Sequence, residues 1–182
     1  MLKEIIEINN VFDNPDEIVE IAKRYKYYSI DNHPVDKNTN ISWEGFRTEF
    51  ILGDNLQFMQ NQITRKLFSS VRSNVNINVQ QDMRMEFHYL TENEKHRKDL
   101  FHIDTTIMAG VVYLSKEINN NPDCGTILLL DDKETIVNNS YNKLIMYRGD
   151  YTHAPANGFG SNINDARLTL NFFIHSIDIS IK

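Results

Sequence analysis

The sequence contains one cysteine, Cys124, so no disulfide bond can form within the chain. A lone cysteine fits a reducing compartment and gives no second thiol for a thiolate metal site. No run of about 18 apolar residues occurs, which excludes a transmembrane helix of the usual length. Lys3, Glu4 and Glu7 interrupt the apolar start, and a secretory signal peptide would not tolerate these charges. The sequence therefore predicts a soluble, cytoplasmic protein that does not enter a membrane.

An excess of basic residues is also missing. Lys and Arg number 19 against 25 Asp and Glu, which gives a net charge of −6. Nucleic-acid binding relies on clustered Lys and Arg, so this balance disfavours nucleic acid as the main partner. The chain of 182 residues lacks repeats and Pro/Gly/Ser-rich linkers, and it is long enough for one core. We predict one domain over 1–182, with a helical N-terminal part at 1–73 and a β-rich core at 74–182.

Two helices are expected in the N-terminal part. In "NPDEIVEIAKRY", Asn14 suits the N-cap, Pro15 the first helical position and Glu17 the capping box. The apolar residues that follow share one helical face: Ile18, Ile21, Ala22 and Tyr25. A second helix is predicted over 54–72, where apolar residues again recur at helical spacing: Leu56, Met59, Ile63, Leu67 and Val71.

From residue 74 the apolar period changes from helical to alternating. The alternating or β-branched segments are short, and polar turn clusters separate them. They are "NVNINV" (74–79), "RMEFHYL" (84–90), "AGVVYLS" (109–115), "TILLL" (126–130), "KLIMYR" (143–148) and "RLTLNFFIHSIDI" (167–179). Many short strands without alternating helices favour a β-sandwich or jelly roll over a parallel sheet. We therefore predict an α+β, mainly β fold, a jelly roll with N-terminal helices packed on one sheet.

One stretch, "FHIDTT" (101–106), raises the question of a metal site. Side chains two apart on a strand share a face, so His102 and Asp104 would point the same way. This pair alone is weak, because a strand end is often merely polar. His153, in "GDYTH", offers a second imidazole. Two histidines and one carboxylate form the facial triad that leaves positions open on a non-haem Fe(II).

A second signal is Arg167, which opens the apolar segment "RLTLNFF". Arg167, Thr169 and Asn171 share one face of that strand. A buried arginine is costly unless it is paired. Its planar guanidinium matches a carboxylate, which suggests a site for an acidic ligand.

The order of H-x-D, "GVVYLS", "GTILLL", "GDYTH" and "RLTLNFF" resembles the 2-oxoglutarate- and Fe(II)-dependent dioxygenases, in particular small prolyl-hydroxylase-like and phage-type members. The resemblance covers roughly residues 82–175, and it implies a double-stranded β-helix, a cupin-like jelly roll. It also implies that His102, Asp104 and His153 bind Fe(II) for a reaction with 2-oxoglutarate and dioxygen. Halide-transferring relatives carry a small residue in place of the carboxylate, so Asp104 implies hydroxylation or oxidative demethylation.

The resemblance further implies that Arg167 binds the distal carboxylate of 2-oxoglutarate. Tyr89, on the strand before H-x-D, is the candidate for a second contact, and Thr169 could assist Arg167. Two features depart from the family pattern. The Gly-Gly-x-Thr turn stands here as "CGT", and the interval from His153 to Arg167 is long. Arg148 therefore remains an alternative for the carboxylate.

Several alternatives stay open at this stage. The prime substrate is expected to be a protein or peptide side chain or an amino-acid-like small molecule. A non-catalytic metal-binding jelly-roll interaction module is a second reading, and a cupin-type metal enzyme that does not use 2-oxoglutarate is a third. The loop "WEGFRTEF" either frames the substrate entrance or anchors itself to the core through Trp43 and Phe46, and the anchor is favoured. An exposed sheet edge or the N-terminal helices could support a homodimer.

Overall fold

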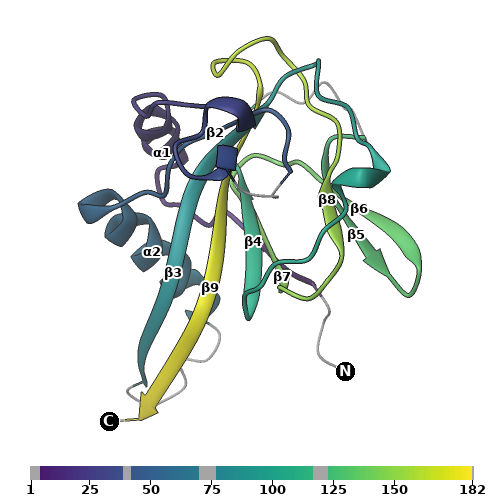
Figure 1. The fold of residues 1–182 in the computed structure, drawn as a ribbon. Coiled ribbons are helices and arrows are strands. Elements are labelled where there is room, and N and C mark those ends of the chain that lie inside the picture. Colours follow the sequence, from purple (N-terminus) through teal and green to yellow (C-terminus); the bar gives the residue numbers. More distant parts are fainter. Residues whose placement is uncertain (1–4, 39–41, 70–76, 117–122, 182) are drawn as a thin grey trace.

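The structure is a computed structural model that describes residues 5–38, 42–69, 77–116 and 123–181. Within these residues the chain forms two α-helices and nine strands, and every strand pair is antiparallel. The strands build two sheets that face each other across the middle of the molecule (Figure 1). The predicted mainly β jelly roll with N-terminal helices is thus confirmed.

The larger sheet has six strands in the order β1-β7-β4-β9-β3-β2. Their bounds are β1 Ile5–Asn9, β2 Phe46–Arg47, β3 Ile77–Leu90, β4 Met108–Tyr113, β7 Lys143–Arg148 and β9 Arg167–Ile181. The smaller sheet has the order β6-β5-β8, with β5 Gly125–Leu130, β6 Lys133–Asn138 and β8 His153–Pro155. Chain-distant strands alternate in the large sheet, as the crossing connections of a jelly roll require.

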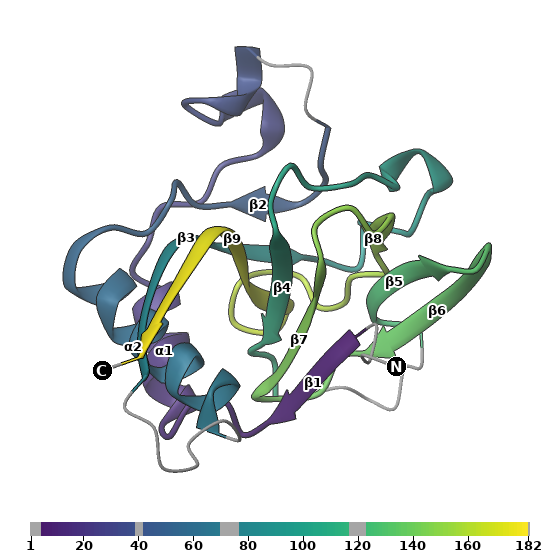
Figure 2. The same ribbon diagram turned by 90° about the horizontal axis from the view of Figure 1, so that it is seen from below.

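Both helices cover the outer face of the large sheet, as Figures 1 and 2 show from two directions. Helix α1 spans Pro15–Ala22 and α2 spans Gly53–Leu67. Asn14 precedes α1 as predicted, but its side chain makes no capping hydrogen bond. Helix α2 ends at Leu67, before the predicted end, and residues 70–72 of that prediction lie outside the described residues.

Alternation along the strands separates two cores. On β9, Leu168, Leu170 and Phe172 point towards the helices and join a cluster with Ile18 of α1 and Ile63 of α2. A smaller cluster fills the space between the sheets, and it includes Val111, Tyr113, Leu128, Ile145 and Tyr147. The cavity that holds the candidate site continues from this second cluster, so the inner face of the large sheet positions the site.

The described part of the predicted strands corresponds to β3, β4, β5, β7 and β9, and residues 74–76 of "NVNINV" lie outside it. Strand β6 was not predicted, because "KETIVN" is charged and mostly exposed. It forms as the second half of a tight hairpin with β5. Asp131 and Asp132 lie between the two strands with φ of 49° and 59°. Two positive φ values in a two-residue loop are those of a type I′ turn, whose twist suits paired strands.

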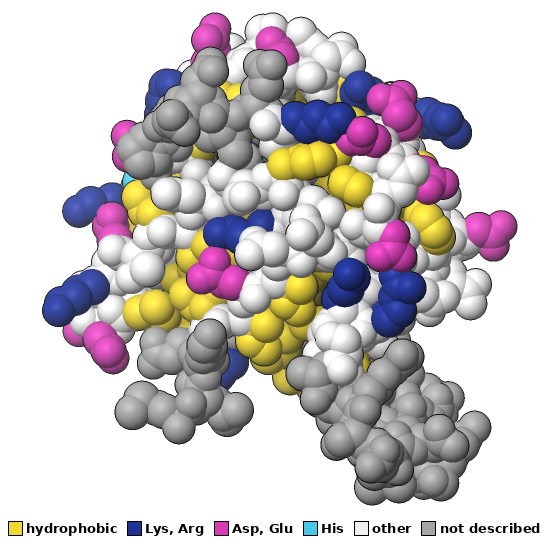
Figure 3. Space-filling model, turned by 180° about the vertical axis from the view of Figure 1, so that it is seen from behind, with side chains coloured by type: hydrophobic (Ala, Val, Ile, Leu, Met, Phe, Trp, Pro, Cys, Tyr) yellow, Lys and Arg dark blue, Asp and Glu magenta, His cyan; other side chains and the backbone are white. Residues whose placement is uncertain are grey.

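The face opposite to that of Figure 1 carries mixed charge. On the described residues of this face, basic and acidic side chains are interspersed between apolar ones, without a large area of one sign (Figure 3). No helix in the described part of the chain is long and apolar enough to cross a lipid bilayer.

Candidate metal centre

A short backbone pairing brings the two candidate histidines together across the open end of the jelly roll. His102 and His153 form an isolated antiparallel bridge, with N–H···O distances of 3.0 and 2.9 Å in the two directions. The amide of Asp104 donates to the carbonyl oxygen of Gly149 at 2.8 Å. The stretch before β4 is therefore held against the turn between β7 and β8.

The three side chains converge on one point. Their ligand atoms all lie within 4.8 Å of one another. The Asp104 carboxylate lies 3.9 Å from Nε2 of His102 and 3.5 Å from Nε2 of His153. The two imidazole rings have centroids 4.3 Å apart. The structure thus brings together the three residues that the sequence singled out, with one carboxylate between two imidazoles.

Both imidazoles present the nitrogen that a metal needs. The Nδ1–H of His102 donates to the carbonyl oxygen of Leu100 at 2.8 Å, and that of His153 donates to the carbonyl oxygen of Tyr151 at 2.9 Å. Only a protonated ring nitrogen can donate to a carbonyl, so each Nε2 carries the free lone pair of the neutral ring. Such backbone contacts fix tautomer and orientation in metal-binding histidines.

The electrostatics of the cluster also fit a cation. Oδ2 of Asp104 is buried and has no hydrogen-bond partner, although buried carboxylate oxygens normally have one. Burial raises the pKa of Asp104, and burial together with the neighbouring His102 lowers the pKa of His153 to about 4. The neutral imidazole and the uncompensated carboxylate are the forms that ligate a divalent metal. The donor set therefore fits a non-haem Fe(II) site with open positions.

A cavity of about 530 Å³ opens beside this cluster, between the two sheets. The three candidate ligands lie in its wall, and Arg167 and Asn171 reach it from β9. Leu100 closes one side from the polar loop that leads into the H-x-D stretch. The volume lies in the range of small-molecule sites, so a ligand and the metal can share one space.

Arg167 lies in this cavity without an acidic partner among the described residues. Its side chain is only 2% exposed, and Nη2 donates to the carbonyl oxygen of Gly125 at 2.6 Å. Nε is buried and makes no hydrogen bond. Burial lowers the pKa of Arg167, and the Tyr113 ring lies 5.9 Å below the guanidinium. A buried cation with spare donors needs an anion, and a carboxylate matches its planar shape.

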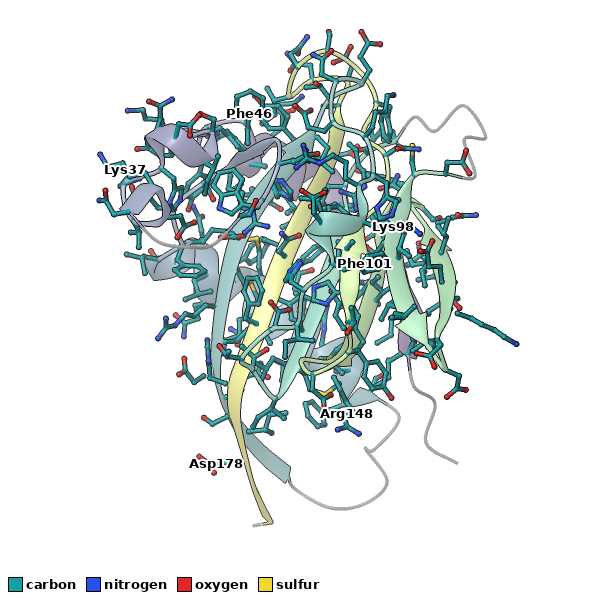
Figure 4. All side chains as sticks on the ribbon, turned by 45° about the vertical axis from the view of Figure 1, so that its right-hand side comes forward. Lys37, Phe46, Lys98, Phe101, Arg148 and Asp178 are labelled. Carbon is teal, nitrogen blue, oxygen red and sulfur yellow. The ribbon has the colours of Figure 1, made fainter. Side chains whose placement is uncertain are left out.

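The other predicted co-substrate residues lie differently. Tyr89 is on the opposite face of β3, where it stacks on Phe46 at 4.8 Å and packs in the cluster under the helices, so it does not line the cavity. Thr169 shares the face of Arg167, but its hydroxyl lies within hydrogen-bond distance of the carbonyl oxygen of His88, at 3.2 Å, and of the Asn171 amide oxygen, at 3.0 Å. Arg148 is exposed and pairs with Asp150, and it does not line the cavity. Figure 4 shows it well apart from Phe101, the residue before His102. Of the two arginines considered, Arg167 is the one in the cavity wall.

Several residues that the sequence did not assign to the site also line the cavity. Glu86 reaches it from β3, Arg47 from β2 and Tyr147 from β7. Alternation around His88 and Tyr89 could have placed Glu86 on the His88 face, but it could not tell which face is inside. In the loop "WEGFRTEF", Trp43 is buried at 5% exposure and anchors the loop to the core, while Arg47 borders the cavity.

Comparisons with known proteins identify the fold. No protein-family model and no curated protein matches the sequence. Among solved structures, a prolyl-4-hydroxylase from Pseudomonas putida is similar over 95% of this chain and 93% of that chain, with a TM-score of 0.60 and 12% identity. An oxidoreductase of the 2OG-Fe(II) oxygenase family from Burkholderia pseudomallei is similar over 94% and 85%, with a TM-score of 0.64 and 10% identity.

A third similar structure is a prolyl hydroxylase from Trichoplax adhaerens, solved with a peptide fragment of the hypoxia inducible factor oxygen degradation domain. It matches 96% of this chain and 84% of that chain, with a TM-score of 0.61 and 14% identity. At such identities the similarity speaks for the fold alone. The chain has the fold of the 2-oxoglutarate- and Fe(II)-dependent dioxygenases.

Proposed function

We propose that this protein is a 2-oxoglutarate- and Fe(II)-dependent dioxygenase that hydroxylates a C–H bond. One observation carries the proposal. His102, Asp104 and His153 converge in the same cavity as Arg167, a buried arginine with an unused donor. A metal triad alone would suit many metal proteins, whereas a triad with a carboxylate clamp suits a metal that binds an acidic co-substrate.

Each residue has a defined part in this proposal. Nε2 of His102, Nε2 of His153 and the Asp104 carboxylate hold Fe(II) and leave its remaining positions open, as in the facial triad. Arg167 binds the distal carboxylate of 2-oxoglutarate and so orients the co-substrate towards the metal. Bound iron supplies the oxygen chemistry. In the overall reaction, one atom of dioxygen enters the substrate as a hydroxyl group. The other enters succinate, which forms as 2-oxoglutarate loses carbon dioxide.

The prime substrate is proposed to be a protein or peptide side chain or an amino-acid-like small molecule. The similar Trichoplax prolyl hydroxylase was solved with a peptide, which supports the first option. The acidic net charge and the mixed charge on the face in Figure 3 support neither DNA nor RNA as the substrate.

The test is an anaerobic titration of Fe(II)-loaded protein with 2-oxoglutarate, followed through the visible charge-transfer absorption of the chelated iron. We expect the band in the wild type and no band in His153→Ala, which loses a ligand. Arg167→Ala should need at least about tenfold more 2-oxoglutarate, because hydrogen bonds to a charged group contribute about 1.5–3 kcal/mol. Arg148→Ala is the matched control, since that arginine is exposed, and it should titrate like the wild type.

Three outcomes count against the proposal. A wild-type protein that binds Fe(II) and shows no band would favour the non-catalytic metal-binding module. A band that is insensitive to Arg167→Ala would place the co-substrate carboxylate elsewhere. Turnover of a substrate by the iron-loaded protein without 2-oxoglutarate would favour a cupin-type enzyme.

A further inference from the structure

The cavity wall also contains an ion pair that is separate from the proposed metal ligands and from Arg167. Nη1 of Arg47 lies 3.3 Å from Oε1 of Glu86, and the two side chains are 17% and 6% exposed. Both residues line the cavity. Arg47 lies on β2 and Glu86 on the neighbouring strand β3. Figure 4 labels Phe46, the residue before Arg47. A buried charge pair of this kind gives little stability compared with apolar packing.

Neither partner uses its full hydrogen-bonding capacity. Oε1 of Glu86 is buried and accepts no hydrogen bond, and Nε of Arg47 is buried and donates none. Asn171, also in the cavity wall, donates to the Glu86 carboxylate from the other side. The ion pair therefore keeps one buried acceptor atom on Glu86 and one buried donor atom on Arg47 that make no hydrogen bond. Buried groups of this kind are normally satisfied by a partner.

The pair lies close to the metal cluster. The Arg47 guanidinium is near enough to lower the pKa of Asp104 and that of His153. Asn171 of β9 is paired with Val111 of β4 on one side and with Glu86 of β3 on the other. Val111 and Phe173 line the same cavity with apolar surface. A molecule bound by its polar end at Arg47 and Glu86 can thus extend an apolar part along this wall towards the metal.

We propose that Arg47 and Glu86 bind the charged head of a free α-amino acid with an apolar side chain, and that this amino acid is the prime substrate. Its ammonium group donates to Oε1 of Glu86, and its carboxylate accepts from Arg47. This inference rests on the proposed oxygenase function and narrows it from two substrate classes to one. The hydroxylated bond then belongs to the amino acid's side chain.

Charge distinguishes a free amino acid from a peptide. An internal peptide residue has an amide N–H and a carbonyl but no charge, so it would bring no opposite charge to Arg47 or to Glu86. A zwitterion brings one charge of each sign and keeps the cavity's net charge unchanged. It thereby adds an opposite charge to each member of the pair in a low-dielectric space, where such contacts are strong.

The binding can be measured without iron, through the protein's single tryptophan. The Arg47 guanidinium lies 4.8 Å from the centre of the Trp43 ring, and Trp43 itself is buried. Metal-free protein is titrated with L-leucine, L-valine, L-methionine and L-phenylalanine while Trp43 fluorescence is recorded, and isothermal titration calorimetry checks the affinity. N-acetyl-L-leucine and L-leucinamide each lack one charge. We expect saturable binding of at least one free amino acid, and at least about tenfold weaker binding of both blocked forms of leucine.

A variant tests the residue itself. Glu86→Gln keeps the shape but removes the charge, and it should weaken amino-acid binding by about tenfold or more. Glu49→Gln changes an exposed glutamate outside the cavity and should bind as the wild type does. Circular dichroism of each variant establishes that it is folded. The comparison of leucine with its two blocked forms uses wild-type protein, so it tests the inference even if a variant does not fold.

The outcomes separate this inference from the oxygenase proposal. If no amino acid of the panel binds, or if N-acetyl-L-leucine and L-leucinamide bind as well as leucine, the inference is overturned, whether or not the charge-transfer band with Fe(II) and 2-oxoglutarate appears. If free amino acids bind and the band is absent, the amino-acid site stands and the oxygenase function fails.

Discussion

Glu86 is the residue at which binding and stability conflict. Burial raises its pKa above the usual 4.5, and the Arg47 charge opposes that rise. A carboxyl group with a raised pKa in the folded state binds more protons there than in the unfolded chain. Its contribution to the free energy of unfolding therefore falls as the pH rises from the unfolded value through the folded one. The charged side chain is kept at a cost to stability, as expected of a binding residue.

The fall in this contribution with rising pH gives a prediction for the metal-free protein. Glu86→Gln cannot titrate, so we expect it to be at least as stable as the wild type at pH 7. The difference between the two should disappear below about pH 4, where Glu86 is protonated in both states. Urea unfolding of both proteins at several pH values measures this. A Glu86→Gln protein that is clearly less stable at pH 7 would mean that the ion pair with Arg47 outweighs the burial of the carboxylate.

The sequence singled out three residues that the structure brings together in the candidate metal cluster, but it missed most of the cavity wall. His102, Asp104 and His153 were proposed as ligands from their order and strand-end positions, which do not depend on which face of a strand is buried. Tyr89 was expected in the site because the family resemblance implies a co-substrate contact from the strand before H-x-D, yet Phe87 and Tyr89 of β3 face the helices. Glu86 and His88 point inward instead. Polar residues normally face solvent, but here the polar face of β3 lines a cavity between the two sheets. The alternating pattern of the sequence cannot reveal that this face is the inner one.

At the scale of elements, the site depends on how closely the turn after β7 packs against the stretch before β4. A Cβ added to Gly149 would lie 2.0 Å from the carbonyl oxygen of Thr106, which is backbone and cannot rotate away. We expect Gly149→Ala to lower the free energy of unfolding by about 1–3 kcal/mol through overpacking. The same change pushes on the hydrogen bond from Asp104 to Gly149, so metal affinity should fall by about 10–100-fold. Calorimetric titration with Fe(II) under argon measures the affinity.

Gly53 supplies the matched control for this prediction. A Cβ there meets nothing within 4 Å, but φ is +65°, so Gly53→Ala is strained without a clash. It should lose about 1–2 kcal/mol of stability while metal affinity stays at the wild-type value. If both alanine variants lowered the affinity alike, the effect would follow from general destabilisation and not from the turn against Asp104.

Short elements explain most of what the sequence could not predict at this scale. Strand β8 spans three residues and β2 spans two, which is too short for any period to be visible. Each exists because a longer strand offers it free hydrogen-bonding groups, β5 in one case and β3 in the other. The long strands β3 and β9 carry their own alternating pattern, and for that reason they were predictable.

At the scale of the molecule, the large sheet has a separate core on each face, and only the inner one adjoins the site. Ile63 of α2 is fully buried in the outer core. Ile63→Ala should therefore lower the free energy of unfolding by about 2–5 kcal/mol and leave metal affinity in the folded protein unchanged. Urea unfolding and a metal titration on the same preparation measure the two quantities. A weakened metal site in folded Ile63→Ala protein would contradict the separation of the cores.

The candidate metal cluster, by contrast, joins the two sheets. His153 begins β8 of the small sheet, whereas His102 and Asp104 lie on the stretch that leads into β4 of the large one. A divalent ion held by all three would stabilise the folded state by about 2.7 kcal/mol at a free concentration 100 times its Kd, provided the unfolded chain does not bind it. We expect Mn(II), which avoids oxygen chemistry, to raise the unfolding temperature of the wild type and not that of His153→Ala.

Because Ile63 lies in the other core, Mn(II) should stabilise Ile63→Ala by the same free energy as the wild type. Unequal stabilisation would mean that the two faces of the large sheet are energetically coupled through it.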